Sequence, residues 1–401
     1  MTINDWTDDR LTRAAIASLL GYGANEVLGL AARLGPASAW QLLRSSEEAI
    51  EGQLKLPGLG RPPGTSGQAF KAWAASINPD QVASRTEAEG FRFIIPGDDE
   101  WPSAIDDLAG CEMGRLGGLP VGLWVAGPGH LVHWCQDAVA MVGSRSATRY
   151  GEAVAMNMAS ALAGEPDVVP WTVVSGGAFG IDAASHRGAL LTGGRTIAVF
   201  ANGLDLYYPP GNTALIKMIK EQGLAVSELP PGAHPTKHGF LARNRIIAAL
   251  ASGVVVVEAG LRSGARNTVS WAAAMGRVVM AVPGPVTSAM SETPHRLIRD
   301  GEATLIACAD DVRALLQPIG QSPELPFTGA PRPGDELSGD ESVVREALPA
   351  RRGITLNEVA LASGVPIQRC IESLRRLAGR GYAVVDEAGR WCAYRQFMEK
   401  S

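Results

Sequence analysis

The chain has 401 residues, of which 46% are hydrophobic, and its formal net charge at pH 7 is −5. A chain of this length can build more than one hydrophobic core, so we expect two or three domains. The acidic balance excludes nucleic-acid binding driven by overall charge alone. Any such binding must come from a local cluster of positive side chains.

The sequence carries no signal for export, membrane insertion or metal binding. It has no run of about 18 uncharged apolar residues, so we predict no insertion into a membrane. Residues 1–15 are acidic and lack an apolar segment of the secretory kind, which favours a cytoplasmic protein. The cysteines are scattered without a CxxC pair, so we expect free thiols rather than disulfides or a zinc site; they are Cys111, Cys135, Cys308, Cys370 and Cys392.

Residues 1–75 have the pattern of a small helical domain. The segments 11–22 and 24–35 place apolar residues at helical spacing, and residues 54–60 read Leu-Lys-Leu-Pro-Gly-Leu-Gly, a glycine-rich turn. We expect a domain of the SAM or helix-hairpin-helix kind, whose loop amides can hold a DNA backbone. A helical packing or dimerisation module fits the same pattern.

Residues 76–316 are predicted to form an α/β domain. From about residue 135 onward, apolar runs alternate with amphipathic helical segments such as 151–163 and 211–223, which is typical of a doubly wound parallel sheet. The runs are almost continuously apolar, as expected for strands covered on both faces. Residues 90–130 are expected to add edge strands or a connection. The predicted strands are 138–143, 172–177, 196–201, 224–229, 253–259 and 277–284.

Residues 317–340 are rich in Pro and Gly without periodicity, so we predict a flexible linker. The following residues, 341–401, have the pattern of a winged helix-turn-helix domain. Thr355 and Glu358 stand at capping-box spacing, which predicts a helix start. A hairpin around 386–389 would form the wing.

The second helix of this C-terminal domain is predicted to have two distinct faces. Its buried face is expected to comprise Ile367, Ile371 and Leu374. Its outer face is expected to comprise Arg369, Arg376 and Arg380. Contact with DNA and docking of a protein partner are both compatible with this arrangement.

The loops after the predicted strands carry the candidate ligand-binding residues, because ligands of doubly wound sheets bind beyond the carboxyl ends of the strands. Gly143-Ser144-Arg145 follows the first strand. The turn Ser175–Gly180 follows the second and opens a helix, so backbone amides and the helix dipole face an anion. Ser263-Gly264 and Thr268 stand at the start of the helix after the strand at 253–259.

A basic and aromatic segment completes this set. Residues 240–245 read Phe-Leu-Ala-Arg-Asn-Arg and follow Lys237. Phe240 could stack on an unpaired base while Arg243 and backbone amides hold phosphates. A phenylalanine that anchors the helix in the core is the alternative. We therefore take a single-stranded nucleic-acid binder as the leading hypothesis.

Catalytic and cofactor motifs do not assemble. The second turn has Ser175 where a dinucleotide fingerprint needs its first glycine, and Ala201 and Asn202 stand where the ribose-binding carboxylate belongs. The sequence has no G-x-S-x-G, H-E-x-x-H or G-x-x-x-x-G-K-[ST] motif. Asp182 and Glu258 could act as general bases, but loop-organising carboxylates are favoured. We predict no catalytic residue, no cofactor and no metal.

Several blocks in one order resemble the DNA-processing protein A family (DprA, also called Smf). They are VGSRSATRYG at 142–151, VVSGGAFGIDAASHRGAL at 173–190, FLARNRIIAALASGVVVVEA at 240–259 and SGARNTVSWAAAMGR at 263–277. The resemblance implies an extended Rossmann-like domain that binds single-stranded DNA, forms homodimers and helps load RecA recombinase in natural transformation. It implies no enzymatic activity.

The resemblance also points to residues. Arg145, the Gly176–Gly180 turn, Lys237, Phe240 and the pair Arg243-Asn244 match motifs that would line the DNA pocket. Leu241 stands where the family usually has proline. With the loop residues above, the predicted DNA-binding set is Gly143, Ser144, Arg145, Ser175, Gly176, Gly177, Ala178, Gly180, Lys237, Phe240, Arg243, Asn244, Ser263, Gly264 and Thr268.

Two other functions compete with DNA binding. The phosphoribohydrolase branch of such folds, which acts on nucleoside monophosphates, carries Pro-Gly-Gly-x-Gly-Thr-x-x-Glu after the corresponding strand. Here the stretch after Glu258 ends in Thr268-Val269-Ser270-Trp271, without the glutamate that would attack a glycosidic bond. A structural or partner-binding role is the third hypothesis.

Overall fold

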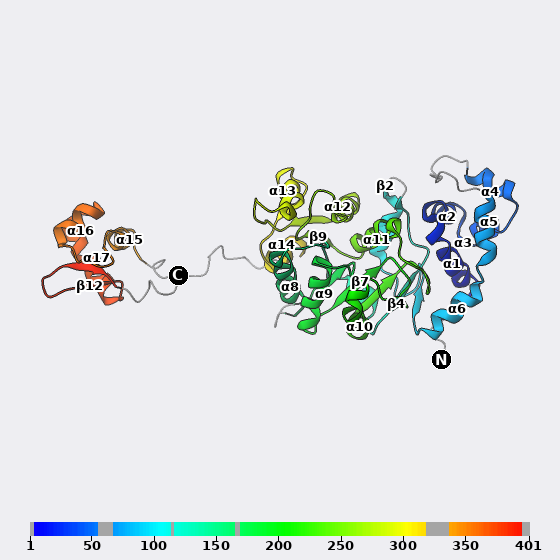
Figure 1. The fold of residues 1–401 in the computed structure, drawn as a ribbon, viewed down its shortest axis with the longest axis horizontal. Helices are drawn as coiled ribbons and strands as arrows, with labels where there is room; N and C mark the ends of the chain where they lie inside the picture. Colours follow the sequence, from blue (N-terminus) through cyan, green and yellow to red (C-terminus); the bar gives the residue numbers. More distant parts are fainter. Residues whose placement is uncertain (1–3, 55–66, 114–115, 165–168, 318–336, 395–401) are drawn as a thin grey trace. The chain divides into compact units, whose positions relative to one another are not determined.

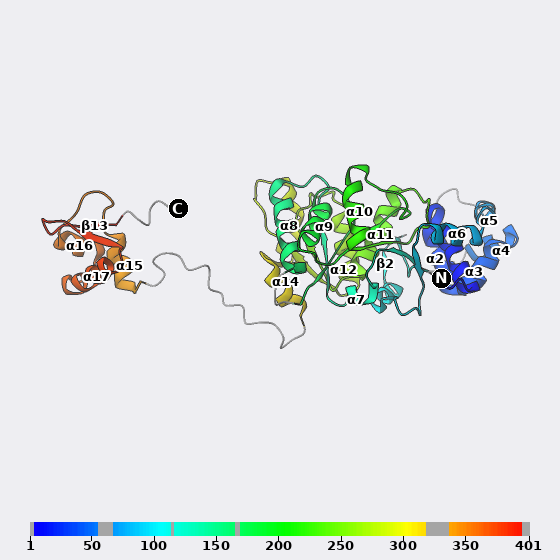
Figure 2. The same cartoon turned by 90° about the horizontal axis from the view of Figure 1, so that it is seen from below.

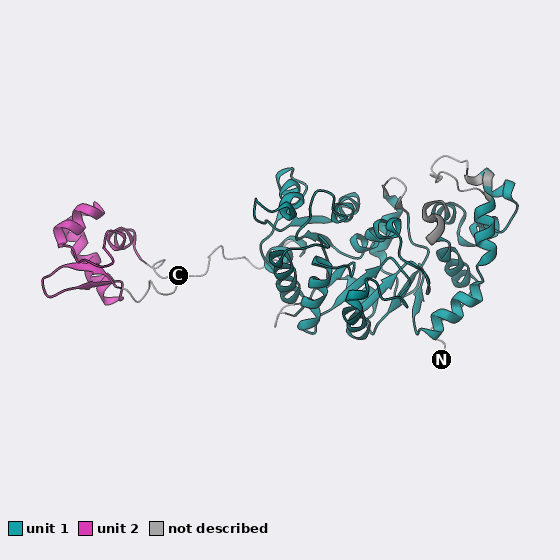
Figure 3. Ribbon diagram, in the orientation of Figure 1, with its two compact units in different colours: residues 1–323 teal, residues 324–401 magenta. Residues whose placement is uncertain are grey.

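The computed structural model resolves the chain into two compact units, residues 1–323 and residues 324–401 (Figure 3). The described residues are 4–54, 67–113, 116–164, 169–317 and 337–394. The domain boundary expected at residue 75 falls inside the first unit. None of the helices in the described ranges combines the length and apolar character that a membrane crossing requires.

A nine-stranded sheet forms the centre of the first unit (Figure 1). The strand order is β1-β4-β8-β7-β6-β5-β9-β10-β11, and all neighbours from β8 to β11 are parallel. The parallel strands are β5 (Ala138–Val142), β6 (Thr172–Ser175), β7 (Thr196–Phe200), β8 (Leu224–Ser227), β9 (Gly253–Val256), β10 (Val278–Ala281) and β11 (Thr304–Leu305). All six strands predicted from the sequence are present, which confirms an α/β protein with a mostly parallel sheet.

Helices cover both faces of this sheet, which explains the continuous apolar strands. Successive side chains of β5 point to opposite faces: Val139 and Met141 share one core, whereas Ala138 and Ala140 belong to another. On one face lie α8 (Arg149–Gly164), α9 (Ile181–Leu191), α10 (Thr213–Gln222) and α14 (Ala309–Leu316), and on the other α11 (Lys237–Ala249) and α12 (Ala265–Ala274).

Two antiparallel strands extend the sheet beyond β8. Strand β4 (Leu123–Ala126) pairs with β8, and β1 (Arg92–Ile94) pairs with β4 at the edge. This confirms the expectation that residues 90–130 add edge strands. Shorter elements connect the larger ones: η1 (Ser103–Gly110), β2 (Glu112–Met113), β3 (Leu116–Gly117), α7 (Leu131–Cys135), η2 (Pro210–Asn212), η3 (Ala289–Ser291) and α13 (Glu292–Arg299).

The N-terminal helices pack against this antiparallel end of the sheet (Figures 1 and 2). Ile16 and Phe70 share a hydrophobic core with Phe93 and Trp124 of the edge strands. Arg10 adds a bidentate ion pair with Asp98, with both N–O distances 2.8 Å. The helices are α1 (Asp8–Ser18), α2 (Leu20–Leu34), α3 (Pro36–Leu43), α4 (Glu47–Leu54), α5 (Gly67–Ser76) and α6 (Pro79–Ala88). All but the first residue of the glycine-rich turn predicted at 54–60 lie outside the described residues.

The second unit contains three helices followed by a two-stranded antiparallel ribbon. These elements are α15 (Gly339–Glu346), α16 (Leu356–Ser363), α17 (Ile367–Gly379), β12 (Ala383–Val385) and β13 (Trp391–Ala393). The capping box of α16 is confirmed: the Thr355 amide donates to the Glu358 carboxylate at 2.7 Å, and the Glu358 amide donates to the Thr355 hydroxyl at 3.4 Å. The predicted hairpin is also present, with its turn at 386–389.

Two details of this unit differ from the sequence-based expectation. Ile367 is 42% exposed because it is the first residue of α17 and lies before the packed stripe. That stripe consists of Cys370, Ser373, Leu374 and Leu377, so Leu374 is buried as predicted, whereas Ile371 is only half-buried. Helix α15 begins at Gly339, capped by the Ser338 hydroxyl, so the predicted linker extends too far.

Candidate nucleic-acid interface

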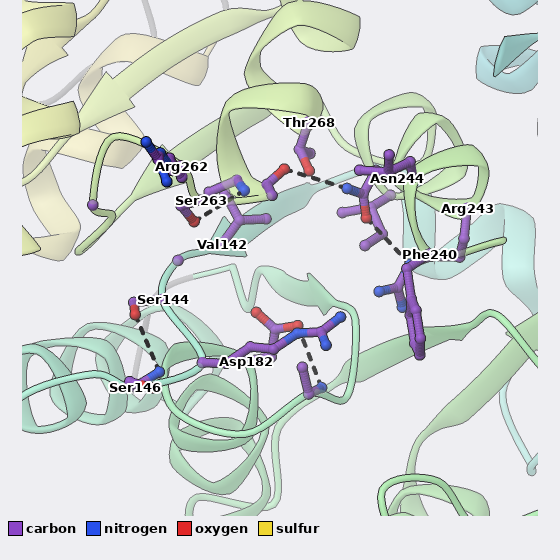
Figure 4. A pocket seen from close by; sticks show the side chains of 18 of the residues that line it. Val142, Ser144, Ser146, Asp182, Phe240, Arg243, Asn244, Arg262, Ser263 and Thr268 are labelled. Atoms are coloured by element: carbon purple, nitrogen blue, oxygen red, sulfur yellow. Dashed lines mark hydrogen bonds between the residues drawn. The ribbon is translucent and has the colours of Figure 1, made fainter. Parts of the chain in front are cut away.

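A pocket of about 420 Å³ lies where the strand order reverses direction. From β5 the chain adds β6, β7 and β8 on one side, then returns through α11 to place β9 on the other side. The loops after β5 and β9 therefore diverge and leave a crevice between them, the usual ligand position in such sheets. Figure 4 shows the residues from these loops, together with α11 side chains, arranged around one space.

The structure brings together most of the residues predicted to bind DNA. Those lining the pocket are Gly143, Ser144, Arg145, Ala178, Phe240, Arg243, Asn244, Ser263, Gly264 and Thr268. Those not lining it are Ser175, Gly176, Gly177, Gly180 and Lys237. Residues more than 100 positions apart in the sequence thus share one cavity, because consecutive strands deliver their carboxyl-terminal loops to the same edge of the sheet.

Four of the five remaining residues shape the pocket from beneath. The Ser175 hydroxyl is buried and donates to the Met141 carbonyl at 2.6 Å, which joins β6 to β5. A Cβ atom on Gly176 would lie 2.6 Å from the Arg243 guanidinium. At Gly180, with φ of 70°, it would lie 2.3 Å from the Ser144 carbonyl oxygen. Gly177 also has a positive φ, 68°. The glycines of this turn therefore let its backbone lie close to Arg243 and to the Ser144 carbonyl.

The Gly143-Ser144-Arg145 turn is fixed by Glu258, at the end of β9. The Ser144 amide donates to the Glu258 carbonyl at 2.6 Å. The Glu258 carboxylate accepts from the Thr148 amide at 2.8 Å and from the Thr148 hydroxyl at 2.7 Å. Glu258 is only 1% exposed, so its carboxylate organises the loop rather than facing the pocket.

Arg145 is exposed and stacks on the ring of Phe240, with its guanidinium carbon 4.7 Å from the ring centroid. Tyr208 contacts the same ring, at a centroid distance of 5.7 Å and an interplanar angle of 37°. Phe240 is half-buried, which leaves part of its ring at the pocket wall. The flat guanidinium of Arg145 lies over the face of the Phe240 ring, and a nucleic-acid base can stack on an aromatic ring in the same way.

Arg243 lies deeper and mainly supports the fold. Arg243 is 6% exposed, and its guanidinium donates to the carbonyl oxygens of Gly176, at 2.7 Å, and Val199. Burial lowers the pKa of Arg243 to about 10, an effect that the neighbouring Asp182 opposes. Burial also raises the pKa of Asp182, although Arg243 acts in the opposite direction. Arg243 therefore stays protonated at pH 7 and faces the Asp182 carboxyl across the pocket floor.

The other basic residues of segment 237–245 differ in how exposed they are. Arg245 is 1% exposed and forms an ion pair with Glu228 at 2.6 Å, so it belongs to the interior. Lys237 is exposed at the start of α11 and does not line the pocket. The accessible guanidinium beside Phe240 is thus that of Arg145, whereas Arg243, which was expected to hold phosphates, and Arg245 are both buried.

The loop between β9 and α12 forms the opposite wall (Figure 4). Asn244 donates to the Gly264 carbonyl at 3.4 Å, which ties α11 to this loop. Ser263 accepts from the Ala265 amide at 3.2 Å, at the first turn of α12. Exposed Arg262 lies beside it. The N-terminus of α12 thus meets the pocket, and its dipole favours a bound anion.

Sequence reasoning missed several pocket residues. Arg262 flanks the predicted Ser263-Gly264 pair, and Asp182 was interpreted as a loop-organising carboxylate, but neither was assigned to the site. Tyr208 does not line the pocket, but its contact with Phe240 could not be predicted either, because it depends on the turn after β7. Leu241 and Ile247 follow from the helical spacing of Phe240 and Asn244 and could have been found. The full set of pocket residues outside the prediction is Val142, Ser146, Asp182, Leu241, Ile247, Gly260, Arg262, Ala265 and Met290.

This arrangement combines a flat ring, two accessible guanidiniums and a helix N-terminus. Those groups suit a ligand that carries both phosphates and flat bases. Among the described residues, no group of three or more His, Cys, Asp or Glu side chains is placed to hold a metal ion. The fold and the pocket together define an α/β protein with a candidate ligand site at the switch point of its sheet.

Known proteins identify the family. Residues 92–317 match the DNA recombination-mediator protein A family. The chain is 47% identical over 309 residues to a putative DNA processing protein DprA of Mycobacterium tuberculosis, covering 75% of this chain and 77% of that protein. It is 40% identical over 212 residues to DNA processing protein DprA of Streptococcus pneumoniae, covering 53% and 72%.

A solved structure agrees with this assignment. The X-ray structure of the Streptococcus pneumoniae DprA protein superposes with a TM-score of 0.60 at 30% identity, covering 78% of this chain and 99% of that one. The chain therefore belongs to the DNA recombination-mediator protein A family. The resemblance inferred from the sequence blocks is confirmed.

Proposed function

We propose that this protein binds single-stranded DNA in the switch-point pocket and helps load RecA recombinase onto the strand. The observation that carries the proposal is the stack of Arg145 on Phe240 at the wall of a pocket lined by the start of α12. A base can stack on the ring while its phosphate meets a guanidinium and the helix dipole. In a duplex both faces of each base are already stacked, so the site favours an unpaired strand.

The same contacts argue for binding without catalysis. Glu258 is bound to Thr148 and turned away from the pocket. Asp182 is buried beside Arg243, and burial raises its pKa. Neither carboxylate is placed as a free nucleophile. Hydrolysis of a nucleoside monophosphate, the enzymatic alternative, remains the reaction to test against this proposal.

The remaining parts of the proposal rest on family membership and local pattern. We assign residues 339–394 to a winged helix, because three helices precede an antiparallel ribbon and Ile354 bridges to Trp391 beside it. The N-terminal helices are proposed to be a SAM or helix-hairpin-helix type of module. A homodimer that acts in the cytoplasm during recombination or natural transformation completes the proposal.

Salt-titrated binding of the full-length chain to matched single- and double-stranded oligonucleotides tests the proposal. We expect tighter binding of the single strand. Phe240→Leu should weaken it by about tenfold or more, whereas Phe240→Tyr, which keeps a ring, should retain most affinity. Equal affinity for both DNA forms, or hydrolysis of nucleoside monophosphates by the purified protein, would contradict it.

A further inference from the structure

Two exposed tyrosines lie next to the pocket without lining it. Tyr207 and Tyr208 follow β7 in one turn and are 37% and 39% exposed. Exposed Lys217, on α10, lies beside them. We call Tyr207, Tyr208 and Lys217 the tyrosine strip. Large aromatic side chains that remain exposed in a folded protein commonly mark a binding surface.

A series of contacts connects this strip to the pocket. The Tyr208 ring contacts the Phe240 ring at 5.7 Å, and Phe240 lines the pocket. Tyr207 is the next residue along the chain, and the Lys217 ammonium is 5.9 Å from its ring centroid. Phe240 and Tyr208 are thus joined by a ring contact, Tyr207 follows as the neighbour of Tyr208 in the chain, and Arg145 and Lys217 supply a cation at each end.

Tyr207 is also held from the interior. The Lys220 ammonium is 4.4 Å from the Tyr207 ring centroid and donates to the Leu204 carbonyl. Burial lowers the pKa of Lys220, while Glu89 and Asp205 oppose the change. Lys220 thus fixes the ring, whereas Lys217 remains exposed to solvent. The two lysines have different roles at one ring.

A DNA strand needs a binding surface beyond the pocket, because the pocket is too small to hold more than a short part of it. A volume of about 420 Å³ is in the range of a single small ligand, so a strand bound there must continue outside. Single-strand binding surfaces combine rings for successive bases with cations for the backbone. On the wall across from Phe240, the loop instead exposes Leu261, which is 57% exposed and offers no ring.

We infer that a single strand leaving the pocket past Phe240 continues over the tyrosine strip, with bases stacked on Tyr208 and Tyr207 and a phosphate at Lys217. This inference rests on the proposed function and extends its binding site to a defined path. The inference specifies on which side of the pocket the strand leaves, namely the side of Phe240 and the turn after β7. The turn after β7 is then a second binding element beside the pocket loops.

The test compares oligothymidylates of about four and about twelve nucleotides on the full-length chain, by fluorescence anisotropy. The wild-type protein should bind the longer strand more tightly. Tyr207→Ala should weaken binding of the longer strand by about tenfold and leave the shorter strand unchanged, because Tyr207 does not line the pocket. Lys217→Ala should weaken binding of the longer strand by a smaller factor. It should also reduce the dependence of that binding on salt concentration.

Tyr150→Ala is the matched control. Tyr150 is 42% exposed and its hydroxyl donates to the Pro283 carbonyl, on a different loop. Tyr207→Phe keeps the ring and should bind both lengths like the wild type. Thermal melting verifies that each variant is folded.

Each outcome separates the two proposals. Failure of the wild-type protein to bind either strand overturns the proposed function, and the path with it. Wild-type affinity of Tyr207→Ala for the longer strand overturns the path alone. A loss in Tyr150→Ala, with none in Tyr207→Ala, would direct the strand the other way and also overturn the inference.

Discussion

The pocket and helix α17 both contain arginines that were candidates for contact with DNA, but the partners of these arginines differ between the two regions. Arg145 lies on the Phe240 ring, and among the described residues no ion pair to it is found. On α17, Arg369 forms an ion pair with Asp340, and Arg376 and Arg380 approach Glu341 at 3.6 and 3.3 Å. The number of arginines in a segment therefore does not give the charge that a ligand meets. Their partners decide it.

The same contrast exists within the pocket itself. Arg243 donates to two carbonyl oxygens and is buried, whereas Arg145 is exposed at the pocket wall. Mutations can separate these two uses, since one should change the free energy of unfolding and the other the affinity for DNA.

The largest expected effect is that of Arg243→Ala. Removing the guanidinium leaves the Gly176 and Val199 carbonyls without their donor and Asp182 without its buried counter-charge. We expect a loss of about 3–5 kcal/mol in the free energy of unfolding, measured by urea denaturation. If Arg243→Ala lost only DNA affinity and kept wild-type stability, the structural role of Arg243 would be wrong.

A second prediction uses pH to distinguish the two units. His186, on α9, is fully buried. Its Nδ1 donates to the Thr196 hydroxyl oxygen, because that hydroxyl already donates to the Val173 carbonyl. Burial lowers the pKa of His186 from 6.5 to about 3, and Arg243 and Arg187 add to the effect. The folded state thus keeps the ring neutral, while the unfolded chain binds a proton below pH 6.5.

The stability that His186 contributes is therefore present above pH 6.5 and falls as the pH drops toward about 3. At pH 5 the loss is about 2 kcal/mol for the first unit. Calorimetry of the full chain should show its transition falling between pH 7 and 5, and His186→Gln should flatten this dependence. In the second unit, the Ser338 amide and two arginines lower the pKa of Glu341, so that unit should weaken only below pH 4.5.

Arg145→Ala tests the role of the exposed arginine, in contrast to buried Arg243. We expect single-strand affinity to fall by about 1–3 kcal/mol, because the cation stacked on Phe240 is lost, and stability to change by less than about 0.5 kcal/mol. Arg149→Ala is the matched control, since Arg149 is exposed at the start of α8 and does not line the pocket. Equal losses in both variants would mean that general charge, not this contact, holds the strand.

The sequence was sufficient for the sheet and for the placement of most pocket residues. Buried parallel strands are continuous apolar runs, and their carboxyl-terminal loops must meet at one edge of the sheet. Gly143, Ser263 and Phe240 could therefore be assigned to one site from three distant segments. The loop positions follow from topology, which apolar patterning encodes directly.

The partners of charged side chains could not be predicted in the same way. Arg243 and Arg245 lie two positions apart on α11, yet one bonds to strand carbonyls and the other to Glu228. Those contacts depend on how α11 packs against the sheet, which helical spacing does not specify. Tyr208 is a similar case, because its contact with Phe240 depends on the path of an irregular turn.

The smallest expected effect concerns Glu341, which pairs with α17. Glu341→Gln removes the negative charge that Arg376 and Arg380 approach, and weakens the cap of α15. We expect a stability loss of about 1 kcal/mol. If α17 contacts DNA, loss of this negative charge beside the arginines should increase the slope of log affinity against log salt by about 1 for duplex DNA. Glu346→Gln is the control, because Glu346 is exposed on the same helix and the change in net charge is identical. Matching slopes for the two variants would show that the α17 arginines serve the fold of the second unit and not a nucleic acid.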